Sequence, residues 1–283
     1  MSNKNYLSIY AKSFNWAGFF LPKKTYQKCS SLYDFCRTVD NIADDGGELN
    51  LKKKNLLFFK NDFIKKNDNN IIIKNMWDLI NNHLISIKIV EDLFDGASSD
   101  LNKKVELNNK KDLLIYSYRV AGTVGLMMAK VLNVKDQNSM RASIDLGIAM
   151  QLTNIARDVV EDSKINRFYI KNDFETISNT LALADLFYKS SFTAINEIPF
   201  KFRFAILVAR RVYKKIGDKI LRTKNIEAYN KAGKIYVNNM EKIFQTIFSI
   251  FDMITLLLTK QKSSYMNDEH FLISEEINLN ERI

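Results

Sequence analysis

Proline and glycine are scarce in this chain, which holds only 2 prolines and 9 glycines among 283 residues. Both residues interrupt regular structure, so their scarcity argues against a turn-rich fold and for long, uninterrupted helices. Hydrophobic residues make up 46% of the chain, which is enough for a sizeable core. The length fits one large domain or two modest ones, and neither a linker nor a repeat of fixed period divides the sequence.

Cysteine is almost absent, and the 2 cysteines are not placed to join each other. Cys29 and Cys36 fall within one helical pattern, where their spacing amounts to about 10 Å along the axis. That distance is too long for a disulfide. The first residues, Met1 to Lys12, are polar and mixed and do not form a signal peptide. We therefore expect a reducing, cytoplasmic setting.

Long apolar runs are also missing. The longest apolar stretch, Ile243–Thr259, is interrupted by Gln245 and Asp252, so it is too short and too polar for a transmembrane span. The pattern favours a buried core helix over a membrane-leaning surface.

Acidic residues are outnumbered, with 32 Asp and Glu against 42 Lys and Arg and a net charge of +10. This balance favours anionic partners such as phosphates, nucleic acid or an acidic membrane surface. Most lysines lie in runs with asparagine, such as Lys52–Lys54, which a solvated surface explains. The arginine and aromatic patterns of RNA-binding modules are not visible, so we expect no nucleic-acid partner.

Apolar residues recur at spacings of three and four almost everywhere, which predicts helices rather than strands. Pro22 and Pro199 each suit a first helical turn, and Gly46 with Gly47 suits a helix end. The predicted helices lie near residues 6–16, 23–43, 51–66, 73–88, 110–133, 137–162, 178–196, 200–222 and 229–259. The polar residues 261–283 are predicted to form a loosely ordered C-terminal tail.

A first polar stripe follows one of these helices, at offsets of 0, 4, 7 and 11. It consists of Tyr33, Arg37, Asp40 and Asp44. The intervening residues are apolar, and polar groups among apolar neighbours are informative. Carboxylates four residues apart can share a magnesium ion, and an arginine one turn earlier can hold a phosphate. An ordinary exposed helix face with an Arg–Asp pair is the alternative.

A second stripe has nearly the same spacing, with offsets of 0, 3, 7 and 11. It consists of Gln151, Asn154, Asp158 and Asp162. Arg157 lies beside it, and Arg167 and Tyr169 follow. Two buried acidic stripes without a cation would cost several kcal/mol or protonate. Magnesium ions with a diphosphate resolve this conflict, because the substrate completes their coordination.

The segment between the stripes begins polar and becomes apolar. Tyr116, Val120, Val124 and Met127 lie on one helix face. Gly122 and Gly125 suit a bend or a close approach. The face suits either simple core packing or a long apolar substrate channel.

These segments resemble the squalene and phytoene synthases, a family that condenses two prenyl diphosphates head to head. The resemblance covers roughly residues 6 to 260. It rests on the opening pattern Ser13–Ala17 with Leu21 and Pro22, the motif of Asp40 and Asp44, the run Tyr116–Met127, the motif Gln151–Asp162, and the later Arg167, Tyr169 and Tyr236. The run Val120–Gly125 is most similar to the phytoene synthase branch. The family often has a second aspartate where this chain has Asn41.

The resemblance implies one all-α isoprenoid synthase domain over residues 1–260, with helices around a central cavity. It implies magnesium, or manganese in its place, on Asp40, Asp44, Asn154, Asp158 and Asp162. It implies substrate binding by Ser13, Tyr33, Arg37, Gln151, Arg157, Arg167 and Tyr236. Tyr116 and Arg157 are the implied catalytic residues, with Tyr116 near the reacting cation.

The implied reaction joins two geranylgeranyl diphosphates through a cyclopropyl diphosphate to give phytoene, without NADPH. Sister enzymes that make squalene, dehydrosqualene or presqualene diphosphate from farnesyl diphosphate are the nearest alternative, because tail length cannot be read from the sequence. A head-to-tail prenyl synthase, a terpene cyclase and a non-catalytic assembly factor on the same fold are more distant ones. A monomer or weak dimer, peripheral on a membrane, is expected.

Overall fold

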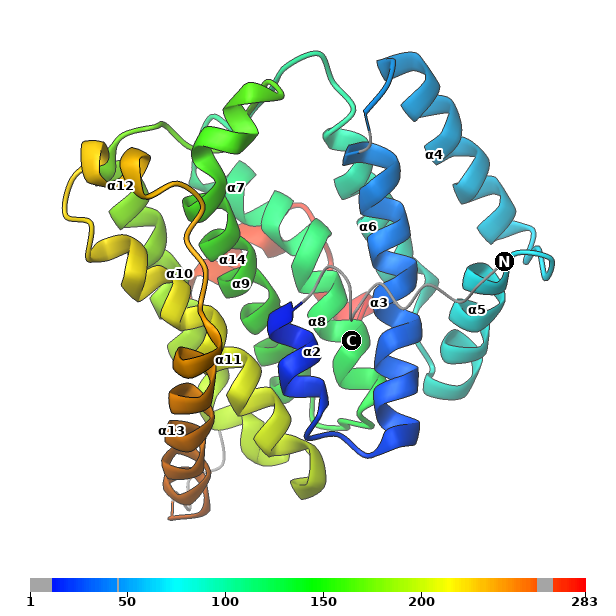
Figure 1. Cartoon of the computed structure of the whole chain (residues 1–283). Coiled ribbons are helices and arrows are strands. Elements are labelled where there is room, and N and C mark those ends of the chain that lie inside the picture. The colour runs from blue at the N-terminus through cyan, green and yellow to red at the C-terminus, as the bar shows by residue number, and fades with distance from the viewer. Residues whose placement is uncertain (1–11, 45, 259–266) are drawn as a thin grey trace.

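The computed structural model describes residues 12–44, 46–258 and 267–283. The predicted all-α class is confirmed for these residues (Figure 1). The helices are α2 Lys12–Gly18, α3 Lys23–Asp44, α4 Leu49–Ile64, α5 Ile71–His83, α6 Ile87–Ser99, α7 Lys110–Ser117, α8 Thr123–Val131, α9 Gln137–Lys164, α10 Phe174–Ala194, α11 Phe200–Leu221, α12 Ile226–Ala232, α13 Asn239–Leu258 and α14 Glu269–Ser274. Short helical turns are η1 Tyr118–Gly122, η2 Ile195–Glu197 and η3 Leu279–Glu281.

Helix α9 is the centre of the bundle and packs against α8, α10 and α11. Helix α3 packs on α8 and on α4, α5 and α6 to one side, while α2 and α13 pack on α11 at the other (Figure 1). Side-chain caps begin several of these helices. The Asp136 side chain accepts a hydrogen bond from the backbone amide of Ser139 at 2.8 Å at the start of α9. The Asp173 side chain accepts one from the backbone amide of Thr176 at 2.7 Å at the start of α10. Each cap contributes about 1 kcal/mol of stability.

Helix α6 was not predicted. The expected helix near 73–88 is instead α5, which ends at Leu84 in the left-handed conformation with φ of 52°. Neither glycine nor proline marks this break, so the usual stop signals are missing. The spacing of Ile89, Leu93 and Ala97, all buried, is the signal that could have revealed α6.

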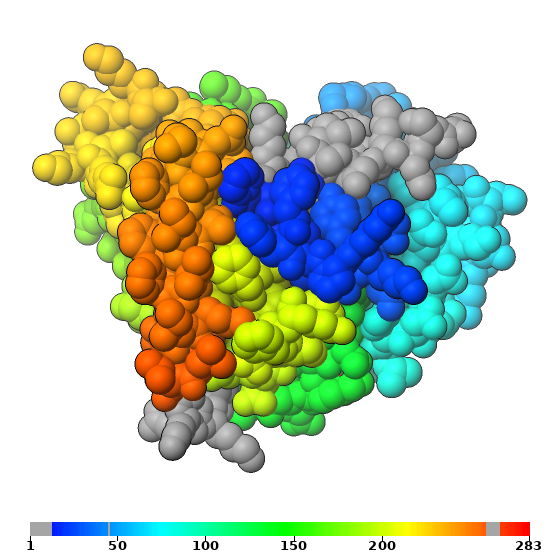
Figure 2. Space-filling model, turned by 60° about the horizontal axis from the view of Figure 1, so that its bottom comes forward, coloured from blue at the N-terminus to red at the C-terminus, as the bar shows by residue number. Residues whose placement is uncertain are grey.

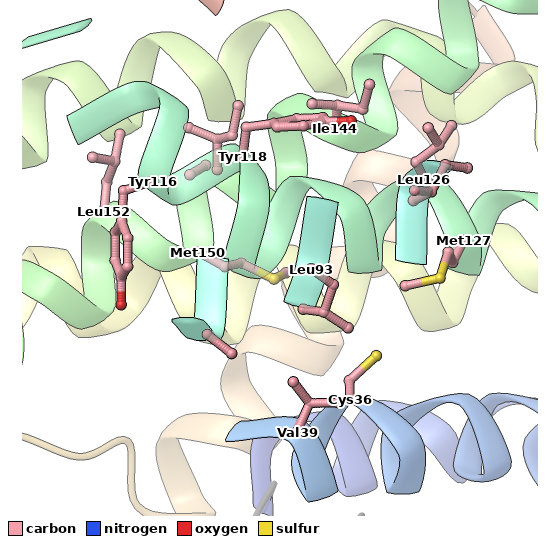
Figure 3. Packing of buried hydrophobic residues seen from close by; sticks show 14 of the residues in the cluster. Cys36, Val39, Leu93, Tyr116, Tyr118, Leu126, Met127, Ile144, Met150 and Leu152 are labelled. Atoms are coloured by element: carbon pink, nitrogen blue, oxygen red, sulfur yellow. The ribbon is translucent and has the colours of Figure 1, made fainter. Parts of the chain in front are cut away.

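The helix predicted near 110–133 is broken by η1, a π-helical turn. Two close backbone approaches accompany this turn. A Cβ added at Gly125 would lie 2.1 Å from the carbonyl oxygen of Ser143, and one added at Gly147 would lie 2.2 Å from that of Ala121. Glycine therefore lets η1 and α8 pack directly against the backbone of α9. Figure 3 shows Tyr116 and Tyr118 of this segment beside the buried side chains of α9.

The single helix predicted near 229–259 is two helices, because Gly233 adopts φ of 60° after α12. In α13 the buried residues are Lys242, Ser249, Asp252 and Leu256. The interpretation of this stretch as a buried core helix is therefore wrong. None of the described helices is long and apolar enough to cross a membrane.

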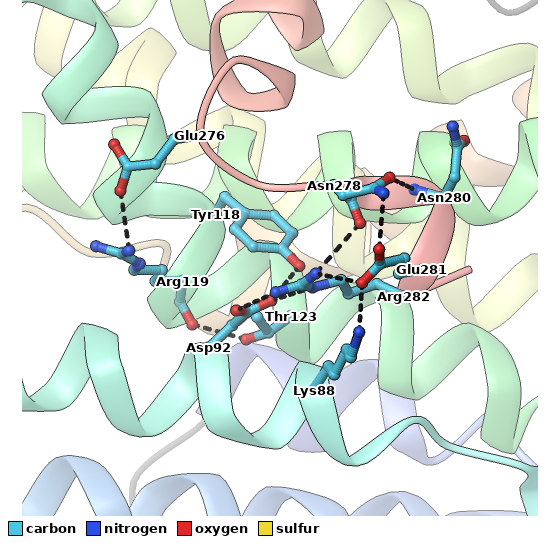
Figure 4. Close-up of polar contacts among 10 residues, drawn as sticks. All are labelled: Lys88, Asp92, Tyr118, Arg119, Thr123, Glu276, Asn278, Asn280, Glu281 and Arg282. Carbon is cyan, nitrogen blue, oxygen red and sulfur yellow. Dashed lines mark hydrogen bonds and ion pairs between the residues drawn. The ribbon is translucent and has the colours of Figure 1, made fainter.

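The prediction of a loosely ordered tail is wrong for residues 267–283. Ile273, Ile277 and Leu279 join the main hydrophobic core. Arg282 donates to both carboxylate oxygens of Asp92, at 2.9 and 3.0 Å, within the polar network of Figure 4. The domain boundary at residue 260 stays a prediction, since residues 259–266 lie outside the described range.

Candidate active site

One large cavity of about 1080 Å³ lies between α3 and α9 and extends toward α2, α8 and α11. Every site residue predicted from the sequence lines it. These residues are Ser13, Tyr33, Arg37, Asp40, Asp44, Tyr116, Gln151, Asn154, Arg157, Asp158, Asp162, Arg167 and Tyr236. The two stripes therefore share one chamber, which the helical spacing alone did not require.

The first acid pair lies on α3. Nη1 of Arg37 lies 3.8 Å from Asp40 and 4.0 Å from Asp44. Arg167 reaches across from the segment after α9 and donates to Asp44 at 2.7 Å. Burial, followed by the charge of Asp44, raises the pKa of Asp40 from 3.8 to about 7.

The second pair lies on α9. Arg157 donates to both oxygens of Asp158, at 2.8 and 2.6 Å, and Nζ of Lys234 lies 3.0 Å from the same carboxylate. Burial, followed by the charge of Asp158, raises the pKa of Asp162 to about 7. The buried Oδ1 of Asn154 has no hydrogen-bond partner.

This donor set fits hard cations. Burial and a neighbouring carboxylate raise the pKa values of Asp40 and Asp162, and the amide oxygen of Asn154 has no hydrogen-bond partner. A divalent ion would offset the negative charge and take the amide oxygen as a ligand. Within the described parts of the chain, no three His, Cys, Asp or Glu side chains converge closely enough to form a metal cage. Magnesium usually takes part of its coordination from water and from phosphate oxygens.

A two-residue parallel strand pair holds Arg167 in place. Strand β1 is Val105–Glu106 and strand β2 is Arg167–Phe168, with Val105 opposite Arg167. The pair ties the loop after α6 to the loop after α9. The guanidinium of Arg167 can therefore reach Asp44 on α3, which also lines the cavity.

A buried network that the sequence did not reveal surrounds Tyr116. Asp100, just after α6, accepts hydrogen bonds from Tyr116 at 2.8 Å and from Tyr169 at 2.7 Å. The two rings are stacked with centroids 4.7 Å apart. Burial, followed by the charge of Asp100, raises the pKa of Tyr116 well above 10, so Tyr116 is a neutral phenol at every physiological pH. Burial also raises the pKa of Asp100.

The wall below this network is apolar, as a substrate channel requires. Tyr116, Val120, Val124 and Met128 line the cavity. Met127, predicted to share their face, is instead fully buried in the core. The π turn in η1 adds a residue to the helical repeat and rotates the following positions. This rotation explains why Met128, and not Met127, faces the cavity.

One further cation and one further phenol of the cavity were not predicted. Lys234 and Tyr213 both line the cavity. Lys234 lies in the loop between α12 and α13. Tyr213 lies on α11, and its ring centroid is 4.9 Å from that of Phe14. Neither position has a local pattern that distinguishes it from other lysines and tyrosines.

Comparison with known proteins adds an independent finding. The sequence profile of the family described as squalene/phytoene synthase matches residues 8–176. This chain belongs to the squalene/phytoene synthase family. It is 36% identical to the 15-cis-phytoene synthase of Paracoccus sp. over 168 residues, which are 51% of this chain and 55% of that enzyme. It is 28% identical to that of Pantoea ananas over 247 residues, 76% and 80% of the two chains.

Solved structures share the fold. The crystal structure of a dehydrosqualene synthase in complex with a ligand superposes with a TM-score of 0.67 at 25% identity, over 88% of this chain and 94% of that one. The squalene synthase HpnC from Alicyclobacillus acidocaldarius superposes with a TM-score of 0.66 at 18% identity, over 80% and 92%. The predicted family, its fold and its class of prenyl-transferring enzyme are confirmed. The roles of individual site residues and the metal stay predictions.

Proposed function

We propose that this protein joins two molecules of geranylgeranyl diphosphate head to head to give phytoene. The observation that carries the proposal is one large cavity lined by two acid stripes, each next to its own arginine. Two such stripes suit two diphosphates, while the apolar depth suits their tails. A volume of about 1080 Å³ lies at the top of the range for pockets that hold one drug-sized ligand. The relatives that carry the name phytoene synthase favour this product.

Magnesium would be held by Asp40 and Asp44 on one side and by Asn154, Asp158 and Asp162 on the other. When bound, it would neutralise the diphosphates and make them better leaving groups. The basic side chains around the acids complete the phosphate site. Arg37, Arg157 and Arg167 can each donate to phosphate oxygens, together with Ser13, Tyr33, Gln151, Lys234 and Tyr236.

The chemistry proceeds in two ionisations. The C–O bond of the first substrate breaks, and the bonding electrons leave with the diphosphate. The double bond of the second substrate attacks the allylic cation, and loss of a proton closes a cyclopropyl diphosphate. Its own C–O bond then breaks, the carbon skeleton rearranges, and loss of a second proton gives the hydrocarbon. No hydride is added, so no NADPH is needed.

The protein's part is to steer and protect these cations. The neutral phenol of Tyr116, fixed by Asp100, presents its oxygen dipole beside the reacting carbons. The apolar wall of Val120, Val124 and Met128 keeps water from quenching them.

A second candidate is condensation of farnesyl diphosphate to dehydrosqualene, favoured by the likeness to the dehydrosqualene synthase structure. The two reactions share every step and differ in tail length. Peripheral attachment to a membrane and a monomeric or weakly dimeric state, in a cytoplasmic setting, belong to the same proposal.

A product assay separates these candidates. Purified protein is incubated with magnesium and either geranylgeranyl or farnesyl diphosphate, in the presence or absence of NADPH. The hydrocarbon product is identified by its mass. Phytoene from the twenty-carbon substrate without NADPH is expected. Squalene formed only with NADPH would contradict the proposal, and dehydrosqualene as the sole product would favour the second candidate.

Substitution tests the acid stripes in the same assay. Asp44→Ala and Asp158→Ala are each expected to lower turnover by about 10²- to 10³-fold, as loss of a transition-state charge contact does. Asp78→Ala, at an exposed position of α5, serves as the control. Helicity should stay unchanged in all three. Retained activity in both stripe variants would refute the metal assignment.

A further inference from the structure

Helix α13 is packed with its polar side inward. The residues it buries are Lys242, Ser249, Asp252 and Leu256. Its outer side is almost wholly apolar. The exposed residues there are Met240, Ile243, Phe244, Ile247, Phe248, Ile250, Phe251, Ile254, Leu257 and Leu258. A surface helix of a protein surrounded by water normally shows the opposite arrangement.

The inner side is fastened by specific polar contacts, so this orientation is well determined. Arg211 of α11 donates to Asp252 at 2.6 Å, and Lys219 donates to Glu241 at 2.8 Å. The indole of Trp16 on α2 donates to Thr246 at 2.9 Å. Rotating α13 to bury its apolar side would break these bonds and leave the charge of Asp252 without its partner.

Neighbouring segments extend the apolar surface. Phe19, in the loop after α2, is 73% exposed, and Phe200, at the start of α11, is 60% exposed. The ring of Phe20 in the same loop contacts Phe204 of α11, with centroids 5.0 Å apart. Figure 2 shows α13, the loop after α2 and the start of α11 on one face of the molecule. This apolar face far exceeds the scattered single residues that need no explanation.

Basic residues outnumber acidic ones around the apolar face, where Glu197, three residues before Phe200, is an exposed acid. Residues 12–33 and 198–217 contain no aspartate or glutamate. The acids of α13 are Glu241 and Asp252, and both are paired with the bases of α11. Lys23, Lys24 and Lys201 are exposed beside the phenylalanines. The rim is therefore mainly basic.

We propose that the apolar face is a docking surface for an anionic lipid bilayer. Its aromatic and aliphatic side chains would enter the headgroup boundary while the lysines pair with lipid phosphates. A second copy of the chain fits less well, because a two-fold contact would bring one mainly basic rim against another.

The cavity lies directly behind the apolar face. Gly18 and Leu21, which flank the exposed phenylalanines of the loop, line the cavity, as does Ile198 just before α11. Asn239 and Lys242 of α13 also line it. Docking would bring the cavity to the bilayer in which prenyl substrates and a hydrocarbon product reside, and this benefit rests on the proposed function. Docking itself needs no catalysis and can be measured apart from it.

Vesicle flotation tests the proposal. The probes are vesicles of phosphatidylcholine alone and of phosphatidylcholine with phosphatidylglycerol. The full chain is expected to float with the anionic vesicles and less with the neutral ones. The double variant Ile247→Gln/Phe251→Gln is expected to lower the bound-to-free ratio by about tenfold or more, given the apolar area lost to water. Glutamine is a good helix former, so α13 should persist.

Matched controls keep the outcomes apart. Leu57→Gln/Phe58→Gln removes similarly exposed apolar side chains from α4, on the opposite side of the molecule (Figures 1 and 2), and should bind vesicles like the original protein. Asp44→Ala should bind vesicles as well as the original protein does, even though its turnover is expected to be strongly lowered. Failure of the original protein to float, or equal binding by the α13 variant, would overturn the proposal. A dimer in solution that the α13 variant abolishes would assign the apolar face to self-association instead.

Discussion

Asp100 illustrates how a single residue can matter without a local signal. It lies at the end of a helix that was not predicted, in a segment without an acidic motif. Only folding brings its carboxylate to Tyr116 and Tyr169, two phenols from distant parts of the chain. Its role in the proposed chemistry is to position Tyr116, because its carboxylate accepts the phenol's hydrogen bond at 2.8 Å.

Asp100→Asn is expected to lower kcat by about tenfold to 10²-fold with little change in KM. The two phenols donate to different carboxylate oxygens, and in asparagine one of these positions is an NH2 group that cannot accept. Tyr116→Phe should have an effect of similar size, and the double variant should be hardly worse than either single one. Asp95→Asn, exposed on the same helix, is the control. Fully additive losses would show that Asp100 does not act through Tyr116.

The raised pKa of Asp40 predicts that the stability of the metal-free protein depends on pH. Its pKa is raised from 3.8 to about 7 in the folded protein, so the folded state binds more protons than the unfolded state between these values. Stability from this group is fully present below pH 3.8 and is lost as pH rises through 7. The carboxylate is 39% exposed to the cavity, so water screens part of the effect.

Asp40→Asn is therefore expected to be more stable than the original protein at pH 8 in EDTA. A gain of about 1 kcal/mol would raise Tm by about 2–4 °C, measured by circular dichroism. The difference in Tm between the two proteins should disappear at pH 4. Saturating magnesium with diphosphate should reverse the order, because only the original carboxylate gains from binding. A variant that melts lower at pH 8 in EDTA would contradict the raised pKa.

Among the elements, α8 and η1 depend on glycine for their distance from α9. Gly125→Ala is expected to destabilise the protein by about 1–3 kcal/mol, the usual cost of overpacking, because its Cβ would meet the Ser143 carbonyl at 2.1 Å. Since this packing positions Val124 and Met128 in the cavity wall, turnover should fall with stability. Gly46→Ala, with nothing within 4 Å of an added Cβ, should change neither. Equal melting temperatures for both variants would refute the close approach.

Helix identity was easier to predict than helix boundaries. Long periodic stretches such as α3, α9 and α11 were placed almost correctly, because one face of each is steadily apolar. The breaks at Leu84, in η1 and at Gly233 were missed. They depend on contacts with other helices or on a local backbone conformation. Glycines lie at the second and third breaks, but none marks the left-handed conformation of Leu84.

At the scale of the whole molecule, one cavity collects side chains from segments far apart in the sequence. The stripes of α3 and α9 face it, and the strand pair carries Arg167 to Asp44. The C-terminal segment closes the other side of the core, where Arg282 pairs with Asp92 and Tyr118 also donates to Asp92, at 2.8 Å (Figure 4). Because Tyr118 begins η1, the end of the chain supports the wall that presents Tyr116.

The sequence by itself determined the all-α class and the two acid stripes, because each depends on spacing along single helices, and its motifs carried the resemblance to the family. It did not determine which way α13 faces, that Asp100 joins the tyrosines, or that residues 267–283 join the core. Those depend on which side chains meet across the bundle. In α13 the polar partners on α11 and α2 decided the orientation, since burying its apolar side would have left Asp252 and Glu241 without their cations.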